Sequence, residues 1–224
     1  MTAPKLALPD TLPLLNSVKI PHLGFGVYLS PEKQCVISCL AALKTGYRHI
    51  DTAQYYGNEK EVGEAVRRSG LKRSELFITT KILEPKGSIE ESYQSVLNSV
   101  YIIDGKDAAV DLFLIHAASA DSKSRKELWL ALERLHKAGK AKSIGVSNYG
   151  IKHIEEMKEY ATIWPPHVNQ LEKGWVPLPK SDAPSRIAAN AEVYGFELSE
   201  EEMSELDKLD QGERGSICYA VKNV

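Results

Sequence analysis

The sequence predicts an α/β protein of the (β/α)8 TIM-barrel type, incomplete, with seven barrel strands in one domain over residues 1–224. Short apolar runs alternate with amphipathic stretches, as expected where helices connect the strands of a parallel sheet. Polar residues stand at the C-terminal ends of successive strands, the face that carries the active site of such a barrel. The length suits one domain with a substantial core.

The first half of the chain consists of repeated strand–helix units, beginning with a strand-like run over residues 23–28. Ser30 is expected to cap a helix over 31–45, with Pro31 in its first position and Gly46 at its exit. Ser88 and Glu91 form a capping box, which begins a helix that continues to about residue 102. The other elements predicted here are strands over 47–51, 76–82 and 110–116 and a helix over 59–68.

The second half continues the alternation as far as residue 170. Helices are predicted over 126–137 and 151–160, and they precede strands over 143–147 and 168–170. A further strand is predicted over 175–179, and helical segments follow near 184–193 and 200–209. No low-complexity linker interrupts this series, so we predict a single domain.

Composition and charge exclude several classes of protein. Hydrophobic residues make up 43% of the chain, charged residues make up 26%, and the net charge is −2. These values give no indication of a nucleic-acid or membrane partner. Pro4, Pro9 and Pro13 interrupt the N-terminal segment, where a signal peptide needs an unbroken apolar run. The sequence therefore predicts a cytoplasmic enzyme or binding domain.

Two of the three cysteines, Cys35 and Cys39, lie four residues apart on one face of a predicted helix. Metal pairing is one interpretation of this spacing. No nearby histidine or cysteine completes such a site, however, so reduced thiols in the core are the better interpretation, and no metal is expected.

Polar residues at the strand ends carry the strongest functional signal. Asp51 would be costly to bury without a cation, and Lys81 is the only basic residue at an equivalent strand end. An ammonium held beside Tyr56 would lower the pKa of its phenol, so that Tyr56 could donate a proton to a carbonyl oxygen. His116 could orient that carbonyl. Singly, the aspartate reads as a turn former and the histidine as a core residue, but together they favour a catalytic site.

These residues fall within motifs that resemble the aldo-keto reductases over about residues 12–210. The motifs occur in the family's order: GYRHIDTAQYYGNEKEVGEA, FITTKI, LFLIH, GKAKSIGVSNYG, VNQ and PLPKS. The resemblance implies Tyr56 as general acid, Lys81 and Asp51 as its tuning pair and His116 as the orienting residue. It also implies NADPH as cofactor, its carboxamide held by Ser147, Asn148 and Gln170 and its adenosine end by Lys180, Ser181, Arg186 and Asn190. A lysine, a hydroxyl and an arginine suit a 2′-phosphate.

The connection after Gln170 departs from the family's pattern, because only residues 171–174 precede the strand predicted at Trp175. The family has a helix, a strand and another helix there. Five virtual bonds reach about 17 Å, barely one strand length, whereas a parallel return normally takes a dozen or more residues. Either a taut parallel return or a tight antiparallel turn at Gly174 is possible, and the turn would aim Lys180 away from the cofactor. A shortened product of the gene, an internal deletion or an error in the gene model would each explain this more simply than an evolved seven-stranded enzyme.

Two functions on this fold are therefore open. One is an NADPH-dependent oxidoreductase that reduces small aldehydes or ketones to alcohols, with weak cofactor binding. The other is a non-catalytic truncated relic or a partner-binding fragment that self-associates through exposed strand edges. An unrelated α/β binding module leaves the ordered motif series unexplained.

Overall fold

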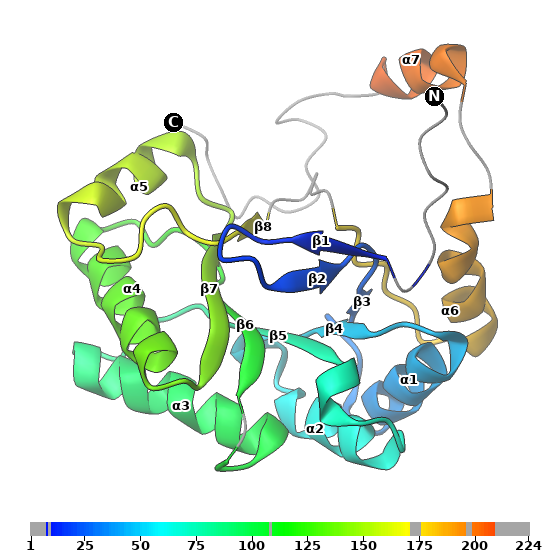
Figure 1. Cartoon of the computed structure of the whole chain (residues 1–224), viewed down its shortest axis with the longest axis horizontal. Coiled ribbons are helices and arrows are strands. Elements are labelled where there is room, and N and C mark those ends of the chain that lie inside the picture. Colours follow the sequence, from blue (N-terminus) through cyan, green and yellow to red (C-terminus); the bar gives the residue numbers. More distant parts are fainter. Residues whose placement is uncertain (1–7, 9, 108, 171–175, 196–198, 209–224) are drawn as a thin grey trace.

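A computed structural model describes residues 8, 10–107, 109–170, 176–195 and 199–208. It contains a curled sheet of six parallel strands with helices around its outer side (Figure 1). The strands follow one another in chain order across the sheet. Their bounds are β3 (Phe25–Gly26), β4 (His49–Asp51), β5 (Phe77–Ile82), β6 (Val110–Ile115), β7 (Ala141–Ser147) and β8 (Asn169–Gln170). The predicted α/β architecture of the (β/α)8 type is confirmed, and the barrel is incomplete in the described part of the chain.

The seventh predicted strand, over 175–179, differs from the expectation. Residue 175 lies outside the described residues, and residues 176–179 do not form a regular strand. Pro177 and Pro179 have no N–H to donate, which prevents a full ladder. Their carbonyls accept hydrogen bonds from the Gly24 and Gly26 amides, at 3.0 and 3.1 Å. Both partners advance together along the chain, so this segment runs parallel to β3, as in the first of the two predicted arrangements.

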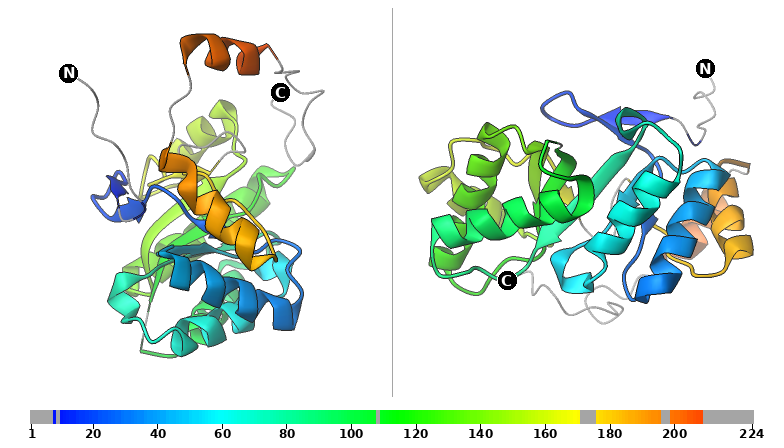
Figure 2. Two further views of the ribbon diagram at one scale, coloured as in Figure 1. Left: turned by 90° about the vertical axis from the view of Figure 1, so that its right-hand side faces the viewer. Right: turned by 90° about the horizontal axis from the view of Figure 1, so that it is seen from below.

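All helices but the last cover the outer side of the sheet in chain order, whereas the last one, α7, stands apart from the sheet, as Figures 1 and 2 show. Their bounds are α1 (Glu32–Thr45), α2 (Glu59–Arg68), α3 (Ile89–Asp104), α4 (Ser122–Lys137), α5 (Ile151–Glu156), α6 (Pro184–Asn190) and α7 (Glu200–Asp207). Single turns of 3-10 helix occur at Gln54–Tyr56, Arg73–Glu75 and Met157–Glu159, and a longer one at Ala191–Gly195. No helix in the described ranges has the length and apolar character needed to cross a membrane.

Caps were predicted for the N-termini of two helices, and the structure has the predicted cap at α3 but not at α1. The predicted capping box of α3 is present, with the Glu91 amide donating to Ser88 Oγ at 3.2 Å. The prediction that Ser30 caps α1 is wrong. Pro31 occupies the cap position and has no polar side-chain atom with which to cap the helix. The Ser30 hydroxyl donates to Asp182 at 2.7 Å.

A hairpin at the N-terminus, β1 (Thr11–Pro13) with β2 (Lys19–Pro21), was not predicted from the sequence. It lies beside the starting ends of the barrel strands, where Asn16 Nδ2 donates to the Lys142 carbonyl at 3.0 Å. Apolar side chains of the hairpin pack with Phe77 and Leu112 in a small hydrophobic cluster on the inner face of the curled sheet. The hairpin therefore covers the end of the sheet opposite the predicted site.

The core lies between the sheet and its surrounding helices, and Trp129 and Tyr47 are its largest fully buried aromatic side chains. Cys35 and Cys39 are buried free thiols in this core, as predicted. No group of three or more metal-ligating side chains occurs among the residues that the structure describes.

At Gly63, α2 lies close to the backbone of α3. A Cβ atom at this position would lie 3.0 Å from the Ile102 carbonyl oxygen and closer still to that of Ile103. Both obstacles are backbone atoms, which cannot move without displacing the end of α3. The glycine is therefore required by packing, although glycine costs about 1 kcal/mol in a helix interior.

We predict that Gly63→Ala lowers the free energy of unfolding by about 2 kcal/mol, because overpacking outweighs the gain in helix propensity. Urea unfolding followed by circular dichroism measures this. Lys60→Ala, at an exposed position of the same helix, is the control and should change stability by no more than about 0.5 kcal/mol. A Gly63→Ala variant as stable as the wild type would contradict the packing account.

Candidate active site

A buried ion pair joins two neighbouring strands at their C-terminal ends. Asp51 pairs with Thr79 in the register of β4 and β5, so Lys81 lies two residues further along and on the same face. Lys81 Nζ forms a salt bridge with Asp51 Oδ1 and donates to the Thr52 carbonyl at 3.0 Å. Lys81 is 1% exposed and Asp51 4% exposed. Gln170 Nε2, from β8, donates to Asp51 Oδ2 at 3.0 Å.

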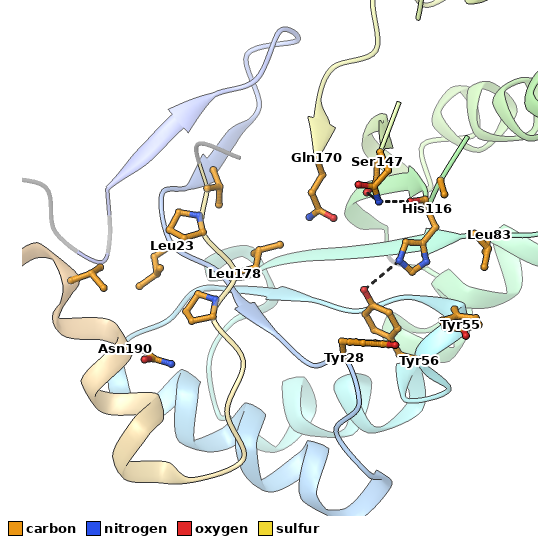
Figure 3. Close-up of a pocket in the computed structure, with 16 residues that line it drawn as sticks. Leu23, Tyr28, Tyr55, Tyr56, Leu83, His116, Ser147, Gln170, Leu178 and Asn190 are labelled. Carbon is orange, nitrogen blue, oxygen red and sulfur yellow. Dashed lines mark hydrogen bonds between the residues drawn. The ribbon is translucent and has the colours of Figure 1, made fainter. Parts of the chain in front are cut away.

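Tyr56 ends the short 3-10 turn that follows β4. Its hydroxyl lies 3.4 Å from His116 Nε2 (Figure 3), and Lys81 Nζ lies 5.2 Å from the centroid of its ring. The ring of Tyr28 packs against that of Tyr56, with centroids 5.0 Å apart. The structure thus brings Asp51, Tyr56, Lys81 and His116 together, as the sequence predicted.

The His116 imidazole is neutral near pH 7. Its pKa is lowered to about 4, mainly by burial and in addition by the Lys81 charge, while the Asp51 charge opposes the shift. A neutral imidazole keeps one N–H donor and one acceptor. Nε2 faces the Tyr56 hydroxyl, and Nδ1 has no hydrogen-bond partner among the described residues. His116 can therefore take part in hydrogen bonding at the cavity without carrying a charge.

A cavity of about 870 Å³ opens beside this group. That volume is within the range of small-molecule and cofactor sites. Six of the eleven site residues predicted from the sequence line it: Tyr56, His116, Ser147, Asn148, Gln170 and Asn190. Asp51 and Lys81 lie buried beneath it. The remaining wall is largely apolar and comprises Leu23, Tyr28, Tyr55, Leu83, Ala117, Val176, Pro177, Leu178, Pro179 and Val193.

The polar residues that line the cavity at the ends of β7 and β8 are joined to one another by hydrogen bonds. Asn148 has φ +55°, and its amide group donates to Ser147 Oγ and to the His116 carbonyl, both at 3.2 Å. The Asn148 backbone amide donates to the Gln170 carbonyl at 3.0 Å. A hydroxyl and two side-chain amides therefore face the cavity from the ends of β7 and β8 (Figure 3).

Of the four residues predicted for the adenosine end of the cofactor, Lys180 and Ser181 precede α6, Arg186 lies in its first turn and Asn190 ends it. Arg186 Nε donates to Ser181 Oγ at 3.2 Å, and Lys180 Nζ forms an ion pair with Asp182 Oδ2 at 2.5 Å. Of these four, Asn190 alone lines the cavity. Ser181 and Arg186 are brought together as predicted, whereas Lys180 is paired with Asp182, which was not among the predicted site residues.

Ten of the lining residues were not predicted from the sequence, and three of them, Tyr28, Tyr55 and Leu83, lie next to predicted strands or motifs. Tyr28 follows β3, and Leu83 follows β5, so both could have been found by the rule that strand ends face the site. Tyr55 precedes Tyr56 within the long motif and is 65% exposed. Its ring centroid lies 6.2 Å from that of His116. These side chains give the cavity an aromatic and aliphatic mouth.

The parallel sheet and the polar constellation at its C-terminal edge define a small-molecule enzyme of the (β/α)8-barrel class. Residues 24–173 match the model of the aldo/keto reductase family. The chain belongs to this family.

Relatives and solved structures agree with this assignment. Glyoxal reductase of Bacillus subtilis is 32% identical over 93% of this chain and 95% of its own length. A crystal structure of MGS-M4, an aldo-keto reductase from a deep-sea metagenome library, is 29% identical, with a TM-score of 0.85 over 95% of this chain and 99% of that one. The Bombyx mori aldo-keto reductase crystallised with NADP is 23% identical with a TM-score of 0.78, over 89% of this chain and 92% of that one, and shares the fold.

His49 lies beneath the ion pair and is fully enclosed. Its Nε2 is 2.9 Å from Thr79 Oγ1, and Nδ1 has no hydrogen-bond partner in the described part of the chain. Burial lowers its pKa to about 4; the Asp51 charge opposes this and the Lys81 charge adds to it. In the unfolded chain an imidazole titrates near pH 6.5. As the pH falls, the unfolded state therefore binds a proton at His49 before the folded state does.

We predict that stability falls as the pH drops from about 6.5 to about 4, because only the unfolded chain is protonated at His49 in that window. A shift from 6.5 to about 4 corresponds to roughly 3 kcal/mol. His49→Gln should flatten the dependence of the unfolding free energy on pH in urea titrations. His22→Gln, in a partly exposed position, is the control. Parallel curves for wild type and His49→Gln would contradict this.

Proposed function

We propose that the protein reduces aldehydes or ketones to alcohols with NADPH, using Tyr56 as the general acid. The observation that carries the proposal is the buried Lys81–Asp51 pair beneath a tyrosine whose hydroxyl lies 3.4 Å from a histidine, all at one cavity. A proton donor beside a fixed positive charge suits a reaction in which negative charge develops on a carbonyl oxygen.

Each residue has a role in proton delivery. Tyr56 donates its proton to the carbonyl oxygen, and the Lys81 ammonium stabilises the phenolate that remains. Asp51 fixes the ammonium and keeps it charged in a buried position. His116, neutral because of its low pKa, donates a hydrogen bond that orients the carbonyl. The apolar wall, which includes Leu23 and Leu178, limits access of water.

The residues at the cavity fit the two ends of NADPH, which supplies the hydride when bound. Ser147, Asn148 and Gln170 offer the hydroxyl and amide groups that a carboxamide requires, and all three line the cavity. Asn190 lines it at the other end. Lys180, Ser181 and Arg186 would hold the 2′-phosphate, since Lys and Arg cations and a hydroxyl match its charge and oxygens.

Two relatives support the substrate and cofactor classes. The Bacillus relative is named a glyoxal reductase, and the silkworm structure contains NADP. A small carbonyl compound is therefore the substrate that we propose for this chain.

We also propose that residues 1–224 fold as one domain, shortened after Gln170, with lower NADPH affinity than a complete barrel of the family. The alignment to the Bacillus relative extends over 268 positions, more than the 224 residues of this chain. Part of the relative thus has no counterpart here. The two halves of the cofactor site add their binding energy only where one rigid geometry engages both.

We predict that Tyr56→Phe removes most of the reductase rate, by at least about 100-fold, because general acid catalysis contributes 10²–10⁴-fold. NADPH affinity should change little, since the hydroxyl acts on the substrate. Stopped-flow oxidation of NADPH and nicotinamide fluorescence measure the two quantities. Tyr101→Phe, on α3 and outside the cavity, is the control. Equal rates for Tyr56→Phe and the wild type would remove Tyr56 from the mechanism.

We predict saturable but weak NADPH binding, together with concentration-dependent self-association through the edge of the short strand β8. Nicotinamide fluorescence measures the first, and light scattering coupled to size exclusion measures the second. Tight binding by a strictly monomeric protein would mean that the shortened barrel closes fully. No binding at any concentration of NADPH would instead favour a non-catalytic, partner-binding role.

A further inference from the structure

Asp182 lies at the centre of the contacts that fix the segment before α6. Its Oδ1 accepts hydrogen bonds from the hydroxyls of Ser30, at 2.7 Å, and Ser38, at 3.3 Å. The side-chain amide of Gln34 donates to its backbone carbonyl at 3.0 Å. All three donors come from α1 or the turn before it. The carboxylate is therefore held in one place by residues about 150 positions away in the sequence.

The second oxygen of this carboxylate faces the proposed phosphate site. Asp182 Oδ2 pairs with Lys180 Nζ at 2.5 Å, and the two side chains are 31% and 33% exposed. Burial raises the pKa of Asp182, but hydrogen bonds from Lys180 and Ser30 outweigh it and hold the pKa below its ordinary value. The carboxylate is thus ionised at neutral pH, and it neutralises Lys180.

We propose that Asp182 sets the selectivity of the chain between NADPH and NADH, lowering its preference for NADPH so that it accepts both. This inference rests on the proposed function. To pair with the Lys180 ammonium, a 2′-phosphate must replace Asp182 as its partner. The negative charge of Asp182 stays close by and repels the phosphate. A free ribose 2′-hydroxyl can instead donate a hydrogen bond to a carboxylate. This is the contact that recognises NAD in other dinucleotide-binding protein folds.

Arg186 and Ser181 can still attract the phosphate while Lys180 is paired with Asp182. Arg186 is exposed and donates to Ser181 Oγ, so a cation and a hydroxyl are available apart from the Lys180–Asp182 pair. With Asp182 present, one of the two cations is compensated. With the carboxylate neutralised, both cations act on the phosphate. The difference between two partly exposed cations and one amounts to roughly tenfold in affinity.

The test is a pair of nicotinamide fluorescence titrations, with NADPH and with NADH, on the full chain and on Asp182→Asn. Asparagine keeps an oxygen acceptor for Ser30 and Ser38 while removing the charge. We expect the ratio of the NADH to the NADPH dissociation constant to rise roughly tenfold in Asp182→Asn. Lys180→Gln should lower the same ratio. Asp182→Ser provides a second neutral variant where Asp182→Asn unfolds.

Glu64→Gln is the matched control, since Glu64 is an exposed carboxylate in an ion pair with Arg68 on α2, outside the cavity. It should leave the ratio unchanged. An unchanged ratio in folded Asp182→Asn or Asp182→Ser, in a wild type that binds NADPH, would overturn this inference and leave the proposed function standing. A wild type that binds neither nucleotide would overturn both.

Discussion

The buried ion pair between Lys81 and Asp51 is the interaction on which the rest of the site depends. Removing two charges from water costs several kcal/mol for each ion, and this cost is offset only where geometry and further hydrogen bonds are good. The Thr52 carbonyl and the Gln170 amide supply those bonds. Because Gln170 reaches Asp51 from β8, the pair also links β8, at one end of the curled sheet, to β4, the second strand from the other end. The positive charge of Lys81 in turn lowers the pKa of His116 and helps to keep it neutral.

The short connection after Gln170 changes how this arrangement is assembled. The segment at 176–179 runs parallel to β3 through the carbonyls of two prolines, so it occupies the place of a barrel strand with fewer hydrogen bonds. Asp182 then fixes the following residues to α1. The adenosine-end residues are thereby anchored to the first strand–helix unit of the chain and do not depend on a strand after β8 for their position.

Much of the fold could be predicted because the pattern is local. The helix over 59–68 is found with those bounds, and β5 begins one residue later than expected. The N-terminal hairpin was missed because its strands are three residues long and each contains a proline. At the site, Asp51, Lys81 and His116 were predictable because each lies at or next to the C-terminal end of a predicted strand. Asp182 was not, because its partners at Ser30 and Ser38 are determined by tertiary packing.

The central claim is that the Lys81–Asp51 pair is retained for carbonyl reduction, since buried ion pairs can often be replaced by apolar residues without loss of stability. The measurement that tests it most directly is the rate of NADPH oxidation with an aldehyde by the double variant Asp51→Leu/Lys81→Met, with urea unfolding of the same sample to establish that it is folded. We predict a folded protein whose stability is within about 2 kcal/mol of the wild type and whose rate falls to background. A folded double variant that reduces the aldehyde at the wild-type rate would contradict the claim.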